Sequence, residues 1–199
     1  MKGLLIALGV VVGILIIWGV IYLWGQSLNN GIVARDENVK AKWGDVQSDY
    51  QRRADLIPNL VATVKGVANF EKSTLVEVTD ARARATSIQV DPTKLDPATI
   101  QKYQAAQGQL STALGRLLVA SENYPDLKAN QNFSELQVQL EGTENRINTA
   151  RIYYNQAVQD YNTTIRAFPS SIVAKSHGYT VKGSFTADAA AQSAPKVSF

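Results

Sequence analysis

An uncharged, apolar run near the start constrains this chain more than any other feature of its sequence. It extends over 23 residues, from Gly3 to Gly25. As a helix it would be about 35 Å long, enough to cross a hydrocarbon core of about 30 Å. Trp18, Tyr22 and Trp24 gather toward its C-terminal end, where aromatic side chains favour the membrane interface. We therefore predict a transmembrane anchor over residues 1–28 that embeds the chain in a lipid bilayer.

A cleaved signal peptide is the alternative interpretation of this run. The run is longer than the apolar region of about 7–15 residues in such peptides, and no small-residue cleavage site follows it directly. We expect an uncleaved, single-pass anchor. Lys2 adjoins the run, whereas Arg35, the first basic residue downstream, lies ten positions past Gly25. Because cationic residues favour the inner side, we expect the soluble part on the outer side.

Gly9 and Gly13 form a GxxxG pattern inside the run. Small residues at this spacing let two helix backbones approach closely, which predicts a packing contact within the membrane and a homo-oligomer. The alternative is that they are ordinary glycines, which are common in membrane helices.

The rest of the chain predicts three long helices. Apolar residues recur in alternating steps of four and three over residues 39–78, 100–124 and 133–168. Such seams are typical of long helices packed lengthwise. The first helix is expected to end near Ser87, and Asp96 and Pro97 to begin the second. Pro125 and Pro169 are expected to stop the second and the third.

Short turns between these helices imply an all-α fold, with an elongated antiparallel bundle over residues 29–169 after the anchor. We expect a flexible joint between the anchor and the bundle at Asn29-Asn30-Gly31. The third helix is expected to begin with a capping box at Asn132. Residues 170–199 are rich in Ser, Ala and Gly, and we predict an extended C-terminal tail.

The stretch QRRADLIPNL, residues 51–60, places a proline inside the first helix. Pro58 has no N–H and frees the carbonyl of Ala54, so we predict a bend within one turn of Pro58. Asn59 is expected to cap that carbonyl or to reach a neighbouring helix.

Charged residues occupy the seams at a few positions. Arg53 and Glu71 fall in the seam of the first helix, where a charge is costly unless it is paired. We predict that the third helix supplies their partners, Glu144 for Arg53 and Arg151 for Glu71, and that the pairs fix helix register. The polar stripe of the third helix comprises Glu144, Asn148, Arg151, Asn155 and Asn162.

The residues needed for catalysis are largely missing. The chain has no cysteine, which excludes disulfides and thiolate metal sites, and its single histidine is His177. Glutamates without neighbouring histidines fall short of a di-iron site, and no nucleotide-binding, hydrolase or zinc-protease motif is present. The net charge of +3 is spread among alternating signs, unlike a nucleic-acid-binding surface. We expect no enzyme, cofactor, metal or nucleic-acid partner; a polar pocket around Glu71, Glu144 and Arg151 would indicate otherwise.

A series of longer motifs resembles the LemA family. The resemblance spans about residues 29–199, and its motifs include Trp43, Arg53-x-Asp55-Leu56-Ile57-Pro58-Asn59-Leu60-Val61, Tyr124-Pro125-Asp126-Leu127-Lys128, Leu140-Glu141-x-Thr143-Glu144-Asn145-Arg146-Ile147 and Pro195-Lys196-Val197-x-Phe199.

This resemblance implies a bacterial membrane anchor with a helical bundle, and no established enzymatic activity or cofactor. Family members are often encoded beside membrane metalloproteases, and one branch takes part in building magnetosome membranes. We expect a non-enzymatic scaffold in the bacterial inner membrane that associates with itself, contacts other envelope membrane proteins and organises the envelope. The alternative is an adaptor or regulator of a membrane protease or envelope stress system.

Overall fold

The computed structural model describes residues 2–67 and 70–186 of the chain, with side chains from Leu8 onward. Within these ranges the regular structure is entirely helical, as predicted. The predicted tail beyond residue 186, with its closing Pro195–Phe199 motif, lies outside the described residues. The helices are α1 (Lys2–Lys65), α2 (Lys72–Ser87), α3 (Pro97–Ser121), α4 (Pro125–Lys128), α5 (Gln131–Arg166) and α6 (Ser170–Ser176).

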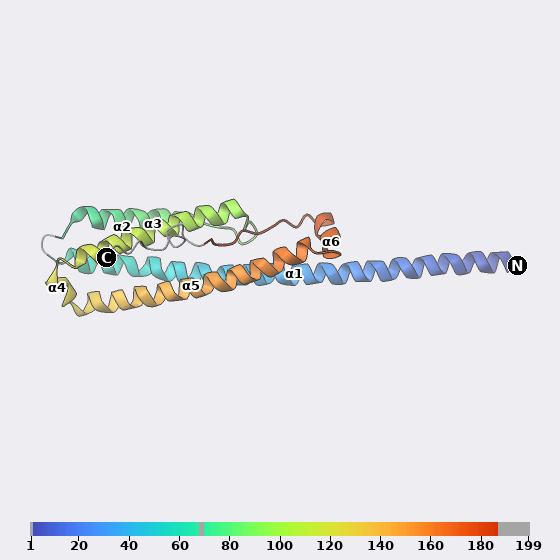
Figure 1. The fold of residues 1–199 in the computed structure, drawn as a ribbon, viewed down its shortest axis with the longest axis horizontal. Coiled ribbons are helices and arrows are strands. Elements are labelled where there is room, and N and C mark those ends of the chain that lie inside the picture. The colour runs from blue at the N-terminus through green and yellow to red at the C-terminus, as the bar shows by residue number, and fades with distance from the viewer. Residues whose placement is uncertain (1, 68–69, 187–199) are drawn as a thin grey trace, which may run out of the picture.

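Helix α1 carries the apolar run away from the rest of the molecule (Figure 1). By length and composition it is a membrane-anchor candidate, and the apolar side chains between Leu8 and Trp24 are exposed. The helix continues without interruption through Asn29 and Gly31, so the expectation of a flexible joint between anchor and bundle is wrong. The candidate span and the bundle therefore share one helix.

Helix α5 packs along α1, and α2 packs along α3 (Figure 1). Phe133, near the start of α5, shares an apolar cluster with Val64 at the end of α1. Ile165, near the end of α5, shares a second cluster with Ile32. The two clusters divide the core at Arg53 of α1, which is 1% exposed.

The first predicted helix is divided, so the expected number of three long helices is wrong. Helix α1 ends at Lys65 and the chain turns back into α2, which begins after Glu71. Gly66 stands at the break, as expected from its low helix propensity. By folding back, α2 buries Leu75 and Val78 against the end of α1 and against α3.

Polar caps begin the later helices. Asp96 Oδ1 accepts a hydrogen bond from the N–H of Thr99 at 3.0 Å, which confirms the predicted start of α3 at Pro97. At the start of α5, Asn130 Oδ1 accepts from the N–H of Phe133 at 3.2 Å, so the capping residue is Asn130 and not Asn132. At its other end, α5 stops at Arg166.

Helix α1 remains helical through Pro58, and the predicted bend there stays a prediction. The carbonyl of Ala54, which Pro58 cannot bond, accepts instead from Arg82 Nε of α2 at 2.7 Å. Among the described residues, the exposed Asn59 side chain bonds neither this carbonyl nor a neighbouring helix, so both expectations for Asn59 are wrong.

The segment after α5 is only partly extended. Residues 170–176 form α6 instead of the predicted extended tail, with Ala174 buried against the cluster around Ile32. Gly178, at φ +72°, turns the chain after α6. From residue 179 the chain is extended and returns along the bundle (Figure 1).

Candidate functional site

Two asparagines of α5 bind the backbone of residues 179–186, a segment called the strap below. Asn162 Nδ2 donates to the carbonyl of Lys182, and Asn162 Oδ1 accepts from the N–H of Lys182, both at 2.9 Å. Asn155 makes the same pair of bonds with Phe185, again at 2.9 Å each. Each carboxamide thus satisfies one peptide donor and one acceptor, as a neighbouring strand would.

The spacing of these asparagines matches the spacing of the strap. Asn155 and Asn162 are seven residues apart on a helix, which is about 10.5 Å along its axis. Lys182 and Phe185 are three residues apart on an extended chain, which is about 10 Å. The match lets an extended backbone follow α5 without loss of register.

Tyrosines one position earlier on α5 repeat this pattern. The hydroxyl of Tyr154 donates to the carbonyl of Gly183 at 2.9 Å, and that of Tyr161 donates to the carbonyl of Thr180 at 3.1 Å. Burial raises the pKa of both tyrosines, to about 12 for Tyr161. The hydroxyls therefore stay protonated, as hydrogen-bond donors must.

The end of the strap is held from α3 and α5 together. Gln104 Nε2 of α3 donates to the carbonyl of Thr186 at 2.8 Å, and Gln104 Oε1 accepts from the N–H of Thr186 at 3.1 Å. Arg151 Nη2 of α5 donates to the same carbonyl at 3.1 Å. Its guanidinium also lies 4.9 Å from the ring centroid of Phe185, a cation–π distance.

Two strap residues enter the core. Phe185 is buried, with ring centroids 6.1 Å from Trp43 and 5.4 Å from Tyr154. Gly183 passes the turn before α3, where its N–H donates to the carbonyl of Leu95 at 2.8 Å. A Cβ on Gly183 would lie 2.6 Å from the Cα of Pro97, so only glycine fits there.

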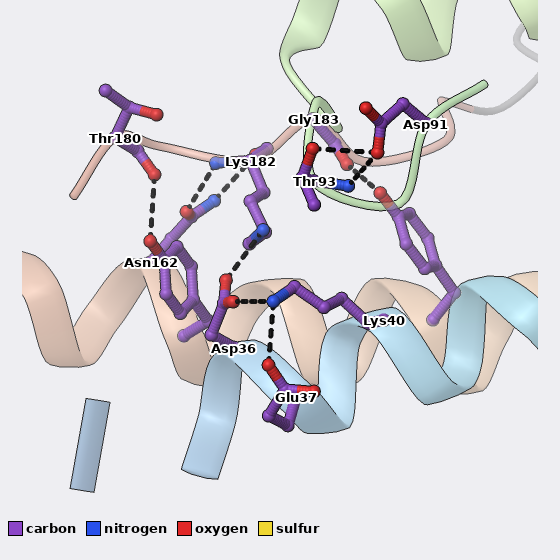
Figure 2. A network of polar contacts seen from close by, with 11 residues as sticks. Asp36, Glu37, Lys40, Asp91, Thr93, Asn162, Thr180, Lys182 and Gly183 are labelled. Atoms are coloured by element: carbon purple, nitrogen blue, oxygen red, sulfur yellow. Dashed lines mark hydrogen bonds and ion pairs between the residues drawn. The ribbon is translucent and has the colours of Figure 1, made fainter. Parts of the chain in front are cut away.

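An ion pair joins the strap to α1 (Figure 2). The Nζ of Lys182 lies 2.7 Å from Asp36 Oδ1, and the Nζ of Lys40 lies 2.7 Å from Asp36 Oδ2. Burial alone would raise the pKa of Asp36, but hydrogen bonds from Lys182 and Lys40 outweigh it and lower that pKa.

Arg53 is the centre of a separate polar cluster. Its Nη1 lies 2.9 Å from Glu144 Oε2 of α5 and 2.8 Å from Ser111 Oγ of α3. Its Nη2 donates to Gln107 Oε1 of α3 at 2.7 Å. The predicted ion pair of Arg53 with Glu144 is present, and the same guanidinium also bonds a third helix.

The other predicted pair is wrong. Glu71 is exposed at the start of α2, where its carboxylate accepts from the hydroxyl of Thr74 at 3.3 Å. Arg151, its expected partner, binds the strap instead. Asn148 is exposed, and within the described part of the chain its side chain has no hydrogen-bond partner. The polar stripe of α5 therefore acts through Arg151, Asn155 and Asn162 on the strap and through Glu144 on Arg53.

Sequence reasoning missed Tyr154, Tyr161, Gln104, Lys182 and Asp36. The apolar seam predicted over residues 133–168 includes both tyrosines, which is correct for their rings but omits their hydroxyls. A signal for the site is the dipeptide Tyr-Asn, which occurs at 154–155 and again seven residues later at 161–162.

A hollow of about 370 Å³ opens beside the Arg53 cluster, and its lining includes Arg53, Glu144 and Arg151. Glu71 does not line it, so the three residues that would have indicated an enzyme do not form one pocket. Among the described residues, no group of three His, Cys, Asp or Glu side chains could hold a metal ion. The arrangement is suited to binding an extended peptide backbone.

Fold and site together define a class: helical proteins with an N-terminal membrane-anchor candidate and a bundle that holds an extended segment of its own chain. Comparison with known proteins places the chain more closely. It belongs to the LemA family, whose sequence model matches residues 42–199.

Individual relatives agree with this assignment. The chain is 26% identical over 144 residues to Protein LemA of Metamycoplasma hominis, an alignment that covers 72% of this chain and 62% of that protein. It is 28% identical over 171 residues to Magnetosome protein MamQ 2 of Paramagnetospirillum magneticum, which covers 75% and 61%. Magnetosome protein MamQ of Magnetospirillum gryphiswaldense is 26% identical over 167 residues, with the same coverage. The chain thus spans about three fifths of the length of these relatives.

Proposed function

We propose that this protein is a membrane-anchored, non-enzymatic scaffold that associates with itself and organises the envelope membrane. The observation that carries the proposal is the continuity of α1 from the candidate span into the bundle core. Because one helix serves both parts, the orientation of the bundle is coupled to that of the anchor. A flexible linker would not transmit orientation in this way.

The strap strengthens this coupling. The hydroxyl of Tyr179 donates to Asn29 Oδ1 of α1 at 3.1 Å, and Lys182 pairs with Asp36 about two turns further along α1. In this proposal, residues 1–28 are the anchor, residues 29–169 are the bundle and residues 170–199 are the tail. The described part of the tail, residues 170–186, ties the membrane-proximal end of the bundle together.

The proposed non-enzymatic role is supported by how the polar stripe of α5 is used. Asn155 and Asn162 make their bonds to the strap backbone, and Glu144 bonds the buried Arg53. These groups serve the packing of the chain itself. A scaffold needs such internal bonds, whereas a catalyst needs polar groups that are free to meet a substrate.

Self-association is proposed to begin within the membrane, at Gly9 and Gly13. In the described structure nothing lies within 4 Å of a Cβ built on either glycine, so this face is open to a second helix. Gly19 is equally open but lies about 80° around the helix from Gly9 and about 120° from Gly13, because successive residues are rotated by about 100°.

These glycines allow a direct test, since the chain has no cysteine. We would introduce single cysteines as Gly9→Cys, Gly13→Cys and Gly19→Cys in the full chain and oxidise native membranes. The proposal predicts disulfide-linked dimers for Gly9→Cys or Gly13→Cys and few for Gly19→Cys. Equal crosslinking at all three positions, or none, would contradict it.

The proposed location is the inner membrane of a bacterial cell, with a single pass and the bundle on the extracytoplasmic side. Val119 of α3 is 72% exposed and suits a topology reporter. A Val119→Cys variant should react with a membrane-impermeant maleimide once the outer membrane is permeabilised. Reaction only after the inner membrane is lysed would place the bundle in the cytoplasm.

A further inference from the structure

The end of the bundle nearest the apolar part of α1 carries exposed apolar side chains. Phe168, in the turn between α5 and α6, is 81% exposed, and Ile172 of α6 is 62% exposed. Figure 1 shows α6 at this end of the bundle, beside α1. Apolar side chains are also exposed elsewhere on the bundle, such as Val119 of α3 at 72%, so it is the position of Phe168 and Ile172 in the fold that indicates their role.

The register of the helices gives the height of this turn above the membrane. Arg53 of α1 is paired with Glu144 of α5, and the two helices run in opposite senses from that pair. Phe168 lies 24 residues after Glu144, and Asn29 lies 24 residues before Arg53. Since both helices rise by about 1.5 Å per residue, Phe168 lies near the level of Asn29.

Independent contacts give the same height. Tyr179, just after α6, bonds Asn29 directly at 3.1 Å. Ala174 of α6 shares a cluster with Ile32. Helix α6 therefore lies beside residues 29–32 of α1, the first turns after the aromatic end of the apolar run.

This level falls at the edge of a bilayer. Asn29 is five residues past Trp24, or about 7.5 Å along the helix axis. The headgroup layer extends about 5–8 Å beyond the hydrocarbon core on each side. Large apolar side chains at this height are within reach of the boundary where amphipathic segments insert.

The charge of this end suits a lipid surface. The sequence has no Asp or Glu between Tyr161 and Thr186, and the first acidic residue of α1 is Asp36. Arg166 and Lys175 flank the turn and are exposed. Cationic side chains beside exposed apolar ones fit a membrane with anionic headgroups.

We propose that the turn after α5 and helix α6 dock on the lipid surface through Phe168 and Ile172. The bundle is then held to the bilayer at a second point beside α1, which fixes its tilt and its rotation about α1. This inference rests on α1 crossing the membrane, as in the proposed function, but it does not depend on self-association.

Spin labels on single cysteines in the full chain test this docking. We would label Ile172→Cys, Val119→Cys and Leu15→Cys, the last in the middle of the apolar run. Each variant is placed in nanodiscs of phosphatidylcholine and phosphatidylglycerol, and collision with oxygen is compared with collision with a water-soluble nickel chelate. Oxygen concentrates in lipid and the chelate in water, so their ratio reports depth.

The docking predicts an oxygen-to-nickel ratio at residue 172 that is several-fold above that at residue 119. A second substitution, Phe168→Glu, should lower the ratio at residue 172 without changing the helix content. Equal ratios at residues 172 and 119, with a lipid-like ratio at residue 15, would overturn the docking alone. A water-like ratio at residue 15 would overturn the membrane anchor as well.

Discussion

The Nζ of Lys182 lies 2.7 Å from Asp36 Oδ1, and this ion pair joins two segments that are far apart in the sequence. The Lys182 side chain is 8% exposed and that of Asp36 is 17% exposed, so water screens the pair only weakly. Asp36 lies on α1 shortly after the candidate span, and Lys182 is in the middle of the strap. The pair therefore fastens the strap to the membrane-proximal part of the bundle.

Asp36→Asn should destabilise the bundle by about 2 kcal/mol, because it leaves the Lys182 ammonium buried without an opposite charge. The measurement is urea unfolding of the full chain in nanodiscs, followed by circular dichroism. Asp45→Asn is the matched control, since Asp45 pairs with Lys42 on the surface of the same helix. This control substitution should lower the free energy of unfolding by less than about 0.5 kcal/mol. Equal losses of unfolding free energy in the two variants would mean that the ion pair of Asp36 stabilises the fold no more than the surface pair of Asp45.

The contribution of Asp36 should also depend on pH. Its pKa in the folded protein lies below the ordinary value of 3.8, so the folded state favours the carboxylate. The resulting stability is fully present above about pH 4 and is lost as the pH falls through the folded-state pKa. We expect the difference in unfolding free energy between the unaltered chain and Asp36→Asn to shrink below about pH 4. A difference that grows on acidification would contradict this sign.

Asn155→Ala and Asn162→Ala should each destabilise the docked strap by about 2–3 kcal/mol, because each leaves one peptide N–H and one carbonyl without a partner. Hydrogen exchange is the sharper measurement. The amide protons of Lys182 and Phe185 should exchange faster in these variants, while those of α3 are unchanged. Asn148→Ala, on the same helix but exposed, serves as the control and should leave strap exchange as it was.

Gly183→Ala should displace the strap. Its new Cβ would lie 2.6 Å from the Cα of Pro97 and 3.0 Å from the carbonyl oxygen of Asp96, both backbone atoms that cannot move aside. We expect a cost of about 2 kcal/mol or more, within the range for overpacked sites. Gly142→Ala, in the middle of α5 with nothing within 4 Å, should instead stabilise the fold by about 0.5–1 kcal/mol. The two variants together separate a steric effect from a general effect of glycine replacement.

Arg53 and Glu144 should be energetically coupled. Arg53→Gln and Glu144→Gln each remove the ion pair, and the double variant should cost less than the sum of the two by about 1 kcal/mol or more. Arg53→Gln should cost more than Glu144→Gln, because Arg53 also bonds Ser111 and Gln107, whereas the Glu144 side chain is 45% exposed. Additive costs would mean that the pair contributes no coupling.

The sequence was informative at several positions where a pattern of residues determines structure. The apolar run predicted the long N-terminal helix, and Asp96 and Pro97 predicted the start of α3. The seam position of Arg53, with Glu144 in the polar stripe of the third helix, predicted their pairing. The break at Gly66 was missed because the four-and-three spacing continues in phase from Val64 to Leu75, on both sides of the turn. A periodic pattern cannot distinguish one straight helix from a helical hairpin that keeps the same phase.

The site was harder to predict because its ligand is a peptide backbone. The carboxamides of Asn155 and Asn162 bind main-chain groups, which every residue carries, so the strap has no side-chain signature to match them. The same applies to the carbonyl of Ala54: Pro58 shows that it is free, but only the fold brings Arg82 to it. In both cases the partner lies far away in the sequence.

Native mass spectrometry of the full chain in lipid nanodiscs tests the proposed scaffold most directly, because it counts the copies that remain together. The proposal predicts an assembly of two or more chains that dissociates in the Gly9→Leu, Gly13→Leu double variant and persists in Gly19→Leu. If the unaltered chain is monomeric at every concentration tested, the proposed self-association is contradicted.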